Sequence, residues 1–146
     1  MQQMNILIIN GPNLNLLGQR EQGIYGDMSF EIFYQQLIKD FPEINFIYFQ
    51  SNIEGELINK LHASQDKVDG VILNAGGYTH TSVALADAVA AVQTPVVEVH
   101  ISNIFNREDY RHVSYIGRHC IGSISGFGLD SYTIASSYYL KKFKKS

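Results

Sequence analysis

Apolar residues in this chain gather in short continuous runs, and between these runs they recur every three or four positions. A short apolar run is typical of a strand buried on both faces of a parallel sheet, and the longer spacing is typical of an amphipathic helix. The runs predict strands at Asn5–Asn10, Asn45–Ser51, Gly70–Asn74, Pro95–His100 and His119–Ile124. Because strands and helices alternate, we expect a parallel sheet with right-handed crossovers.

The segments with helical spacing predict four helices. Ser29 is a candidate cap for the first helix, and Pro42 follows its end. The second helix carries Ile53, Leu57, Ile58 and Leu61. An alanine-rich helix begins at Thr81 or Ser82 and ends near Val92, and Asp130 is a candidate cap for a last helix that continues into the lysine-rich tail.

These elements predict an α/β fold, a flavodoxin-like three-layer sandwich with a five-stranded parallel sheet in the order 2-1-3-4-5. The 146 residues fit a single catalytic domain over residues 1–146 and are too few for an eight-stranded barrel. Ligands bind such sheets beyond the carboxyl ends of the strands, where the strand order reverses. That rule brings together residues 11–26, 74–82 and 100–111, which follow the first, third and fourth strands.

The charged residues in these segments indicate the kind of ligand. Arg20, Arg107 and Arg111 are three of the four arginines, whereas every lysine lies elsewhere. Arginine suits the recognition of planar anions and hydroxyls, so we expect a small anionic, oxygen-rich substrate. No lysine is placed to form a Schiff base, and the five histidines lack zinc-type spacing, so neither an imine mechanism nor a metal site is expected.

Two pairs of residues are candidates for acid–base chemistry. Glu98 and His100 lie two apart on one predicted strand and share a face. The carboxylate can orient the imidazole and favour its protonated form, which makes His100 a candidate general acid; a core histidine without chemistry is the alternative. Tyr25 is a candidate base if Arg20, on the same glycine-rich segment, stabilises its phenolate, and a packing role is the alternative.

Other polar groups near the strand ends are candidates for binding substrate. Asn74 ends the third strand before two glycines and either contacts the ligand or caps the turn. His80 precedes a helix start, where an imidazole and free N–H groups can meet substrate oxygens. The backbone N–H groups of Ile101 and Ser102 can hold a carboxylate.

Composition narrows the function classes further. The chain is 45% apolar and 17% charged with a net charge of −3, which indicates a globular protein and argues against nucleic-acid binding. No apolar stretch is long enough to span a membrane, and no signal peptide is recognised. The one cysteine, Cys120, lies in an apolar run, which predicts an inert thiol. A cytoplasmic location is therefore expected.

The segments GPNLNLLGQRE, IYG, NAGGYTHTSVALADA and EVHISNIFNREDYRHVSY resemble the type II dehydroquinases in order and spacing over essentially the whole chain. The resemblance implies a flavodoxin-like fold and a homododecamer built from trimers. It also implies the dehydration of 3-dehydroquinate to 3-dehydroshikimate in the shikimate pathway, without metal or cofactor.

The same resemblance implies roles for individual residues. Tyr25 would take a proton from C2, with Arg20 favouring its phenolate, and His100, oriented by Glu98, would protonate the departing C1 hydroxyl. Asn13 would hold a water that stabilises the enolate. The substrate carboxylate would bind Asn74, Ile101 and Ser102, and the ring hydroxyls would bind His80, Arg111 and Asp87 of a neighbouring subunit. Arg107 matches a further arginine of the family's site.

The sequence departs from the family pattern at three positions, and it also leaves a second function open. Gln22 and Ala75 stand where the family pattern leads us to expect proline, and Gly77 stands where alanine is frequent, so the glycine-rich segment GQREQGIYG (residues 18–26) is predicted to be less restrained. The alternative function is a flavodoxin-like domain that binds a phosphorylated ligand without turnover.

Overall fold

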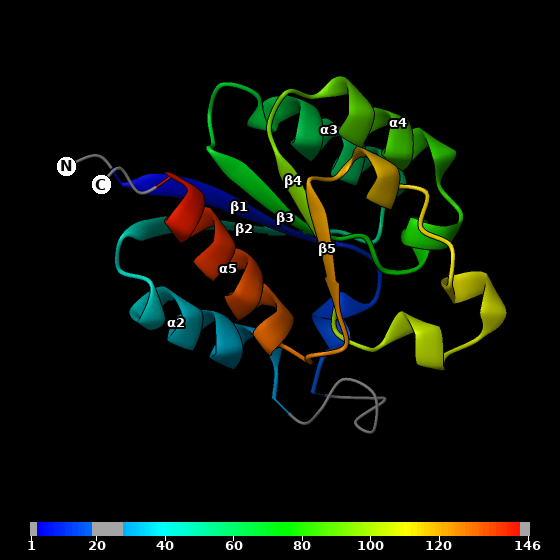
Figure 1. Cartoon of the computed structure of the whole chain (residues 1–146), viewed down its shortest axis with the longest axis horizontal. Coiled ribbons are helices and arrows are strands. Elements are labelled where there is room, and N and C mark those ends of the chain that lie inside the picture. The colour runs from blue at the N-terminus through cyan, green and yellow to red at the C-terminus, as the bar shows by residue number, and fades with distance from the viewer. Residues whose placement is uncertain (1–2, 19–27, 144–146) are drawn as a thin grey trace.

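The structure is a computed structural model that describes residues 3–18 and 28–143. Five strands form one parallel sheet in the order β2-β1-β3-β4-β5 (Figure 1). They are β1 (Met4–Asn10), β2 (Ile44–Gln50), β3 (Gly70–Asn74), β4 (Val96–His100) and β5 (Gly122–Ser125). The predicted fold class and strand order are confirmed.

Helices cover both faces of the sheet. Helices α2 (Phe30–Asp40) and α5 (Asp130–Phe143) lie on one face, and α3 (Glu54–Ser64) and α4 (Val83–Ala91) lie on the other (Figure 1). The predicted cap forms at Ser29, whose Oγ accepts a hydrogen bond from Ile32 N–H at 3.4 Å. Of the two starts left open for α4, Ser82 is the cap, and its Oγ accepts a hydrogen bond from Leu85 N–H at 2.8 Å.

The central strand β1 shows why its sequence is an unbroken apolar run. Its successive side chains point to opposite faces of the sheet. Ile6 and Ile8 belong to the core under α2 and α5, whereas Leu7 and Ile9 belong to the core under α3 and α4. All four are buried, so each position needs an apolar side chain.

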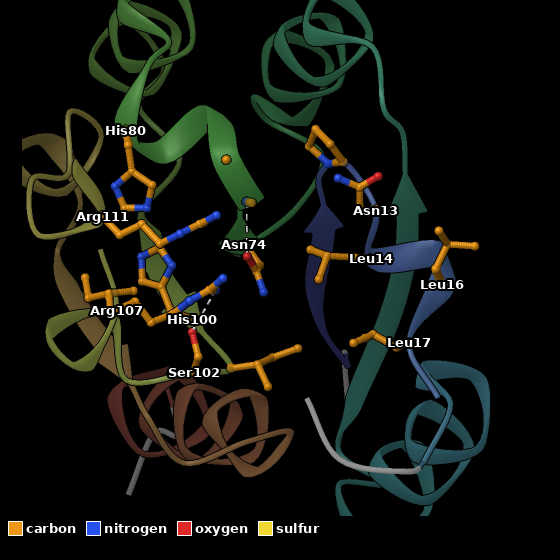
Figure 2. A pocket seen from close by; sticks show the side chains of 15 residues that line it. Asn13, Leu14, Leu16, Leu17, Asn74, His80, His100, Ser102, Arg107 and Arg111 are labelled. Carbon is orange, nitrogen blue, oxygen red and sulfur yellow. Dashed lines mark hydrogen bonds between the residues drawn. The ribbon is translucent and has the colours of Figure 1, made fainter. Parts of the chain in front are cut away.

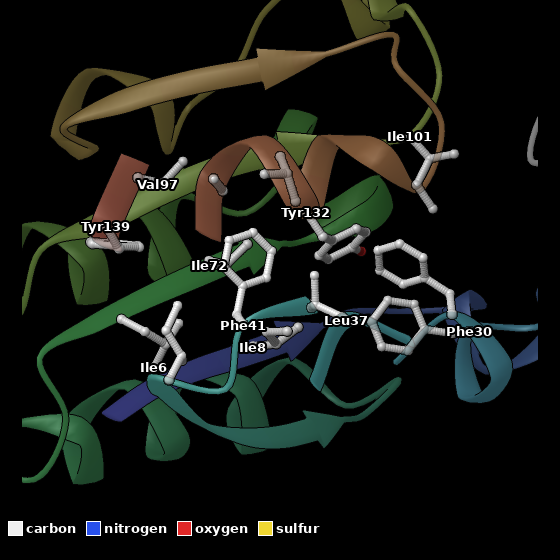
Figure 3. Packing of buried hydrophobic residues seen from close by; sticks show 14 of the residues in the cluster. Ile6, Ile8, Phe30, Leu37, Phe41, Ile72, Val97, Ile101, Tyr132 and Tyr139 are labelled. Atoms are coloured by element: carbon white, nitrogen blue, oxygen red, sulfur yellow. The ribbon is translucent and has the colours of Figure 1, made fainter. Parts of the chain in front are cut away.

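Aromatic rings fill much of the core beneath α2 and α5 (Figure 3). The ring of Tyr132 meets that of Phe30 edge-on, with centroids 5.0 Å apart. Tyr139 is also fully buried, and its hydroxyl donates to the Val71 carbonyl at 2.8 Å. Helix α5 is thereby fixed against the amino-terminal part of β3.

The predicted start of the fifth strand, His119, is wrong. Residues Gly117–His119 form a 3₁₀ turn, and Cys120 N–H closes it onto the Gly117 carbonyl at 3.1 Å. Pairing with β4 begins only where Gly122 lies opposite Val97. Cys120 packs against the core under α3 and α4, whereas Ile121 is exposed. Burial raises the pKa of the Cys120 thiol to about 12, in agreement with the expected inert thiol.

Within residues 3–18 and 28–143, no helix has the length and apolar character needed to cross a membrane.

Candidate active site

A pocket opens at the carboxyl ends of β1, β3 and β4, where the strand order predicted it (Figure 2). Its lining comes from the three segments that follow those strands. The residues are Pro12, Asn13, Leu14, Leu16 and Leu17; Asn74, Gly76, Gly77 and His80; and His100, Ile101, Ser102, Ile104, Arg107 and Arg111.

Two opposite sides of this pocket differ in chemistry (Figure 2). The leucine wall follows β1 and consists of Asn13, Leu14, Leu16 and Leu17. The basic wall consists of His80, His100, Ser102, Arg107 and Arg111. Asn74 lies between the two walls at the end of β3.

Glycines bring the segments after β1 and β3 into contact. Gly11 N–H donates to the Asn74 carbonyl at 2.7 Å, and a Cβ at Gly11 would lie 2.5 Å from the Ala75 carbonyl oxygen. Gly76 has a φ of +60° and packs against Pro12, where a side chain would be both strained and crowded. These close approaches set the distance between the leucine wall and Asn74.

The basic wall contains a buried histidine–carboxylate pair. Nε2 of His100 lies 2.7 Å from Oε2 of Glu98, and both side chains are buried. Glu98 also accepts hydrogen bonds from Ser114 Oγ and Ser123 Oγ, each at 2.5 Å. Burial alone would raise the pKa of Glu98, but the hydrogen bonds from His100, Ser114 and Ser123 outweigh it and lower that pKa.

This arrangement fixes the tautomer of His100. A carboxylate oxygen can only accept, so Nε2 carries the proton of the shared hydrogen bond, and Nδ1 is the nitrogen left for a ligand. The period of the strand predicted the pair. Sequence reasoning missed Ser114 and Ser123, because nothing in their local pattern shows that they meet Glu98.

His80 has the opposite tautomer to His100, with its proton on Nδ1. Its Nδ1 lies 2.7 Å from the Val113 carbonyl oxygen, an acceptor, so Nδ1 donates and Nε2 of the neutral ring is an acceptor. Burial lowers the pKa of His80, and the neighbouring His100 and Arg111 add to this effect. The rings of His80 and His100 stack with centroids 6.2 Å apart.

The two arginines are anchored next to these rings. Arg111 Nε donates to Glu108 Oε1 at 2.9 Å, and Arg107 donates through one terminal nitrogen to Ser102 Oγ at 3.4 Å. Hydrogen bonds from Tyr110 and Arg111 lower the pKa of Glu108 to about 2. The pocket therefore presents two guanidinium groups and can bind an anionic, hydroxylated ligand.

Asn74 takes part in a buried hydrogen-bond chain as well as lining the pocket. Its Nδ2 donates to Tyr132 Oη at 3.0 Å, its Oδ1 accepts from Gly76 N–H at 3.2 Å, and Tyr132 Oη donates to Asn10 Oδ1 at 2.6 Å. Both roles suggested by the sequence, turn capping and contact with a ligand, are compatible with this position.

Most of the predicted site residues meet in this pocket. The lining includes Asn13, Asn74, His80, His100, Ile101, Ser102, Arg107 and Arg111, and Glu98 lies behind His100. Asp87 does not line it and is exposed on α4. Arg20, Gln22 and Tyr25 lie outside the described residues.

Over the described ranges, no three His, Cys, Asp or Glu side chains come together as a metal site requires, and no lysine lines the pocket.

Known proteins resemble this chain over nearly its whole length. Residues 4–140 match the family model for Dehydroquinase class II. A 3-dehydroquinate dehydratase from Exiguobacterium sp. is 55% identical over 90% of this chain and 91% of its own length. One from Fusobacterium nucleatum is 51% identical over 97% of this chain and 100% of its own. The solved structure of a type II dehydroquinase from Butyrivibrio crossotus matches with a TM-score of 0.90 at 41% identity, covering 93% of this chain and 97% of that one.

Proposed function

The chain belongs to the class II dehydroquinase family, and from that membership we propose that it dehydrates 3-dehydroquinate to 3-dehydroshikimate. The observation that carries the proposal is the buried Glu98–His100 pair facing a pocket with two arginines. An acid next to an anion site is what the loss of a hydroxyl from a hydroxylated carboxylate requires.

The reaction needs a base and an acid on one substrate. A base removes the proton on C2, next to the C3 carbonyl, and an enolate forms. The enolate then expels the C1 hydroxyl, which leaves as water after taking a proton from the acid. We assign the base to Tyr25, kept as phenolate by Arg20; both lie outside the described residues, and the assignment rests on the family resemblance.

His100 is the proposed acid. Its Nε2–H is engaged by Glu98 at 2.7 Å, so the proton for the leaving hydroxyl comes from Nδ1 of the imidazolium. After the transfer the neutral ring keeps its Nε2–H on Glu98 and does not need to turn. The serine donors on Glu98 help to keep the carboxylate ionised throughout.

Substrate binding is assigned to the rest of the pocket. We propose that Asn74 and the N–H groups of Ile101 and Ser102 hold the carboxylate. His80 Nε2 accepts a hydrogen bond from one ring hydroxyl, and Arg111 donates to another. Arg107 is a further binding residue on the same wall. Asn13 holds a water that stabilises the enolate.

The assembly and setting are also proposals. We propose a homododecamer of trimers, in which the exposed Asp87 on α4 reaches the site of a neighbouring subunit. The enzyme would act as one catalytic domain, in the cytoplasm, in the shikimate pathway, and without metal or organic cofactor.

The test is a single assay. Adding 3-dehydroquinate to the purified protein should produce the absorbance of a conjugated enone, and His100→Ala should produce it far more slowly. A protein that binds the compound without any new absorbance would contradict the proposal and favour the binding-domain alternative, which no observation here supports.

A further inference from the structure

We infer that Asn52 is a positioning residue for this reaction: it holds Asn13 on the leucine wall from outside the pocket. The inference rests on the proposed function, in which Asn13 binds the water that stabilises the enolate. Asn52 lies between β2 and α3 and does not line the pocket. Its connection to the chemistry is therefore invisible in the sequence.

The contact is made by the side-chain oxygen of Asn52. Oδ1 accepts a hydrogen bond from Asn13 N–H at 3.0 Å and a second from Gln50 Nε2 at 3.2 Å. Gln50 Nε2 also donates to the Gly11 carbonyl at 3.1 Å. Two residues after the end of β1 are thus bound by the side chains of Gln50, the last residue of β2, and of Asn52 just beyond it.

Asn13 needs such support because of its backbone conformation. Its φ is 70°, in the left-handed region that residues with a side chain adopt at a cost. Asn13 is also the residue from which the 3₁₀ turn Leu14–Leu16 begins. A hydrogen bond to its own N–H restrains φ directly, and the direction of the Asn13 side chain follows from that φ.

Asn52 also makes a hydrogen bond to the segment that follows β3. Its main-chain carbonyl accepts a hydrogen bond from Tyr78 Oη at 3.0 Å. Tyr78 lies in the 3₁₀ segment Gly76–His80, two residues before the imidazole of the basic wall. One residue after β2 therefore connects the segments that follow β1 and β3.

The chemistry of these bonds gives a selective test. Asn13 N–H and Gln50 Nε2 both donate to Oδ1, so the side chain of Asn52 acts here as an acceptor. Asn52→Asp keeps an acceptor in the same place, whereas Asn52→Ala removes it. The control is Asn45→Ala, because Asn45 also links β2 to β1, its Nδ2 donating to Asn5 Oδ1 at 2.9 Å, but at the amino ends of the strands, opposite the pocket.

The experiment compares kcat and KM for 3-dehydroquinate in these variants. Asn52→Ala should lower kcat about 3- to 10-fold, the effect of one or two hydrogen bonds, with KM nearly unchanged. Asn52→Asp and Asn45→Ala should stay close to the parent. If Asn52→Ala does not fold, Asn52→Leu, of similar volume, takes its place.

A double-mutant cycle shows whether Asn52 acts through Asn13. In an Asn13→Gly background the side chain to be oriented is gone, so adding Asn52→Ala should cost no further activity. A second fall of the same size, an equal loss in Asn52→Asp, or an unchanged Asn52→Ala would overturn the inference. An inactive parent would instead refute the proposed function, so the two failures are distinguishable.

Discussion

The leucine wall and the basic wall of the pocket are built by different means. Leu14 and Leu17 are buried in the aromatic core under α2 and α5, and their turn is closed by a backbone hydrogen bond from Leu16 N–H to the Asn13 carbonyl. On the basic wall each titratable side chain has a polar partner, such as Glu98 for His100 and Glu108 for Arg111. The leucine wall gives the pocket its apolar shape, and the basic wall carries its charged and proton-donating groups.

Substitutions in the two walls should therefore affect different properties of the protein. Changes to the buried leucines should act through the stability of the fold, because their side chains interact with the core. Changes to the basic wall should act on turnover, because its groups face the substrate.

The largest effect is expected for His100→Ala on the basic wall. General acid catalysis is worth about 10²–10⁴ in rate, so kcat should fall by that factor. Substrate affinity, measured by calorimetry, should change little. A kcat within a few-fold of the parent would mean that His100 is only a core histidine.

On the leucine wall, Leu17→Ala should destabilise the protein. Leu17 is 3% exposed, and removing such a side chain costs about 2–5 kcal/mol of unfolding free energy. Leu16→Ala, at a half-buried position in the same turn, is the control and should cost less. Urea unfolding at fixed protein concentration measures both, and equal losses would show that burial on this wall does not decide stability.

The hydrogen bond that orients His100 can be disturbed without replacing His100 or Glu98. A Cβ at Gly117 would lie 2.9 Å from Oε1 of Glu98, so Gly117→Ala should displace the carboxylate and lower kcat on the order of tenfold. Gly122→Ala, where a Cβ meets nothing within 4 Å, is the control. Equal steady-state rates in the two variants would show that the position of the Glu98 carboxylate does not affect catalysis.

The smallest expected effect is a pH dependence of stability. The pKa of Glu98 is lowered from its ordinary 4.5, so the folded state binds the proton less readily than the unfolded state. Its stabilising contribution is complete above the ordinary value and is lost as the pH falls through the folded pKa. Glu98→Gln should therefore be less stable than the parent near neutral pH, and the difference should shrink as the solution is acidified. A difference that stays constant across this range, measured by urea unfolding, would contradict the assignment.

The sequence predicted the sheet and the position of the pocket well, and for a physical reason. The apolar runs and helical spacing of this chain reflect burial on two faces, and the strand order then decides which segments meet. The two-residue period placed Glu98 beside His100. The start of β5 was missed because Cys120 and Ile121 are apolar without belonging to a strand.

The contacts that hold the site in place were not predictable. Ser114 and Ser123 reach Glu98 from separate segments, and Asn52 reaches Asn13 across 39 positions. Ser123 lies on β5, opposite Glu98, whereas Ser114 and Asn52 lie between elements. Serine and asparagine have many ordinary roles, so nothing in their local pattern distinguishes these positions. The roles assigned to Arg20 and Tyr25 lie outside the described residues and stay predictions.

The most direct test of the account is a crystal structure of Tyr25→Phe with 3-dehydroquinate bound. Without the proposed base the substrate should remain intact, and its position then reports on every assigned contact. The account predicts the C1 hydroxyl within hydrogen-bond distance of His100 Nδ1 and the carboxylate on the N–H groups of Ile101 and Ser102. A C1 hydroxyl turned away from His100, or a carboxylate bound to Arg107 and Arg111 instead, would contradict it.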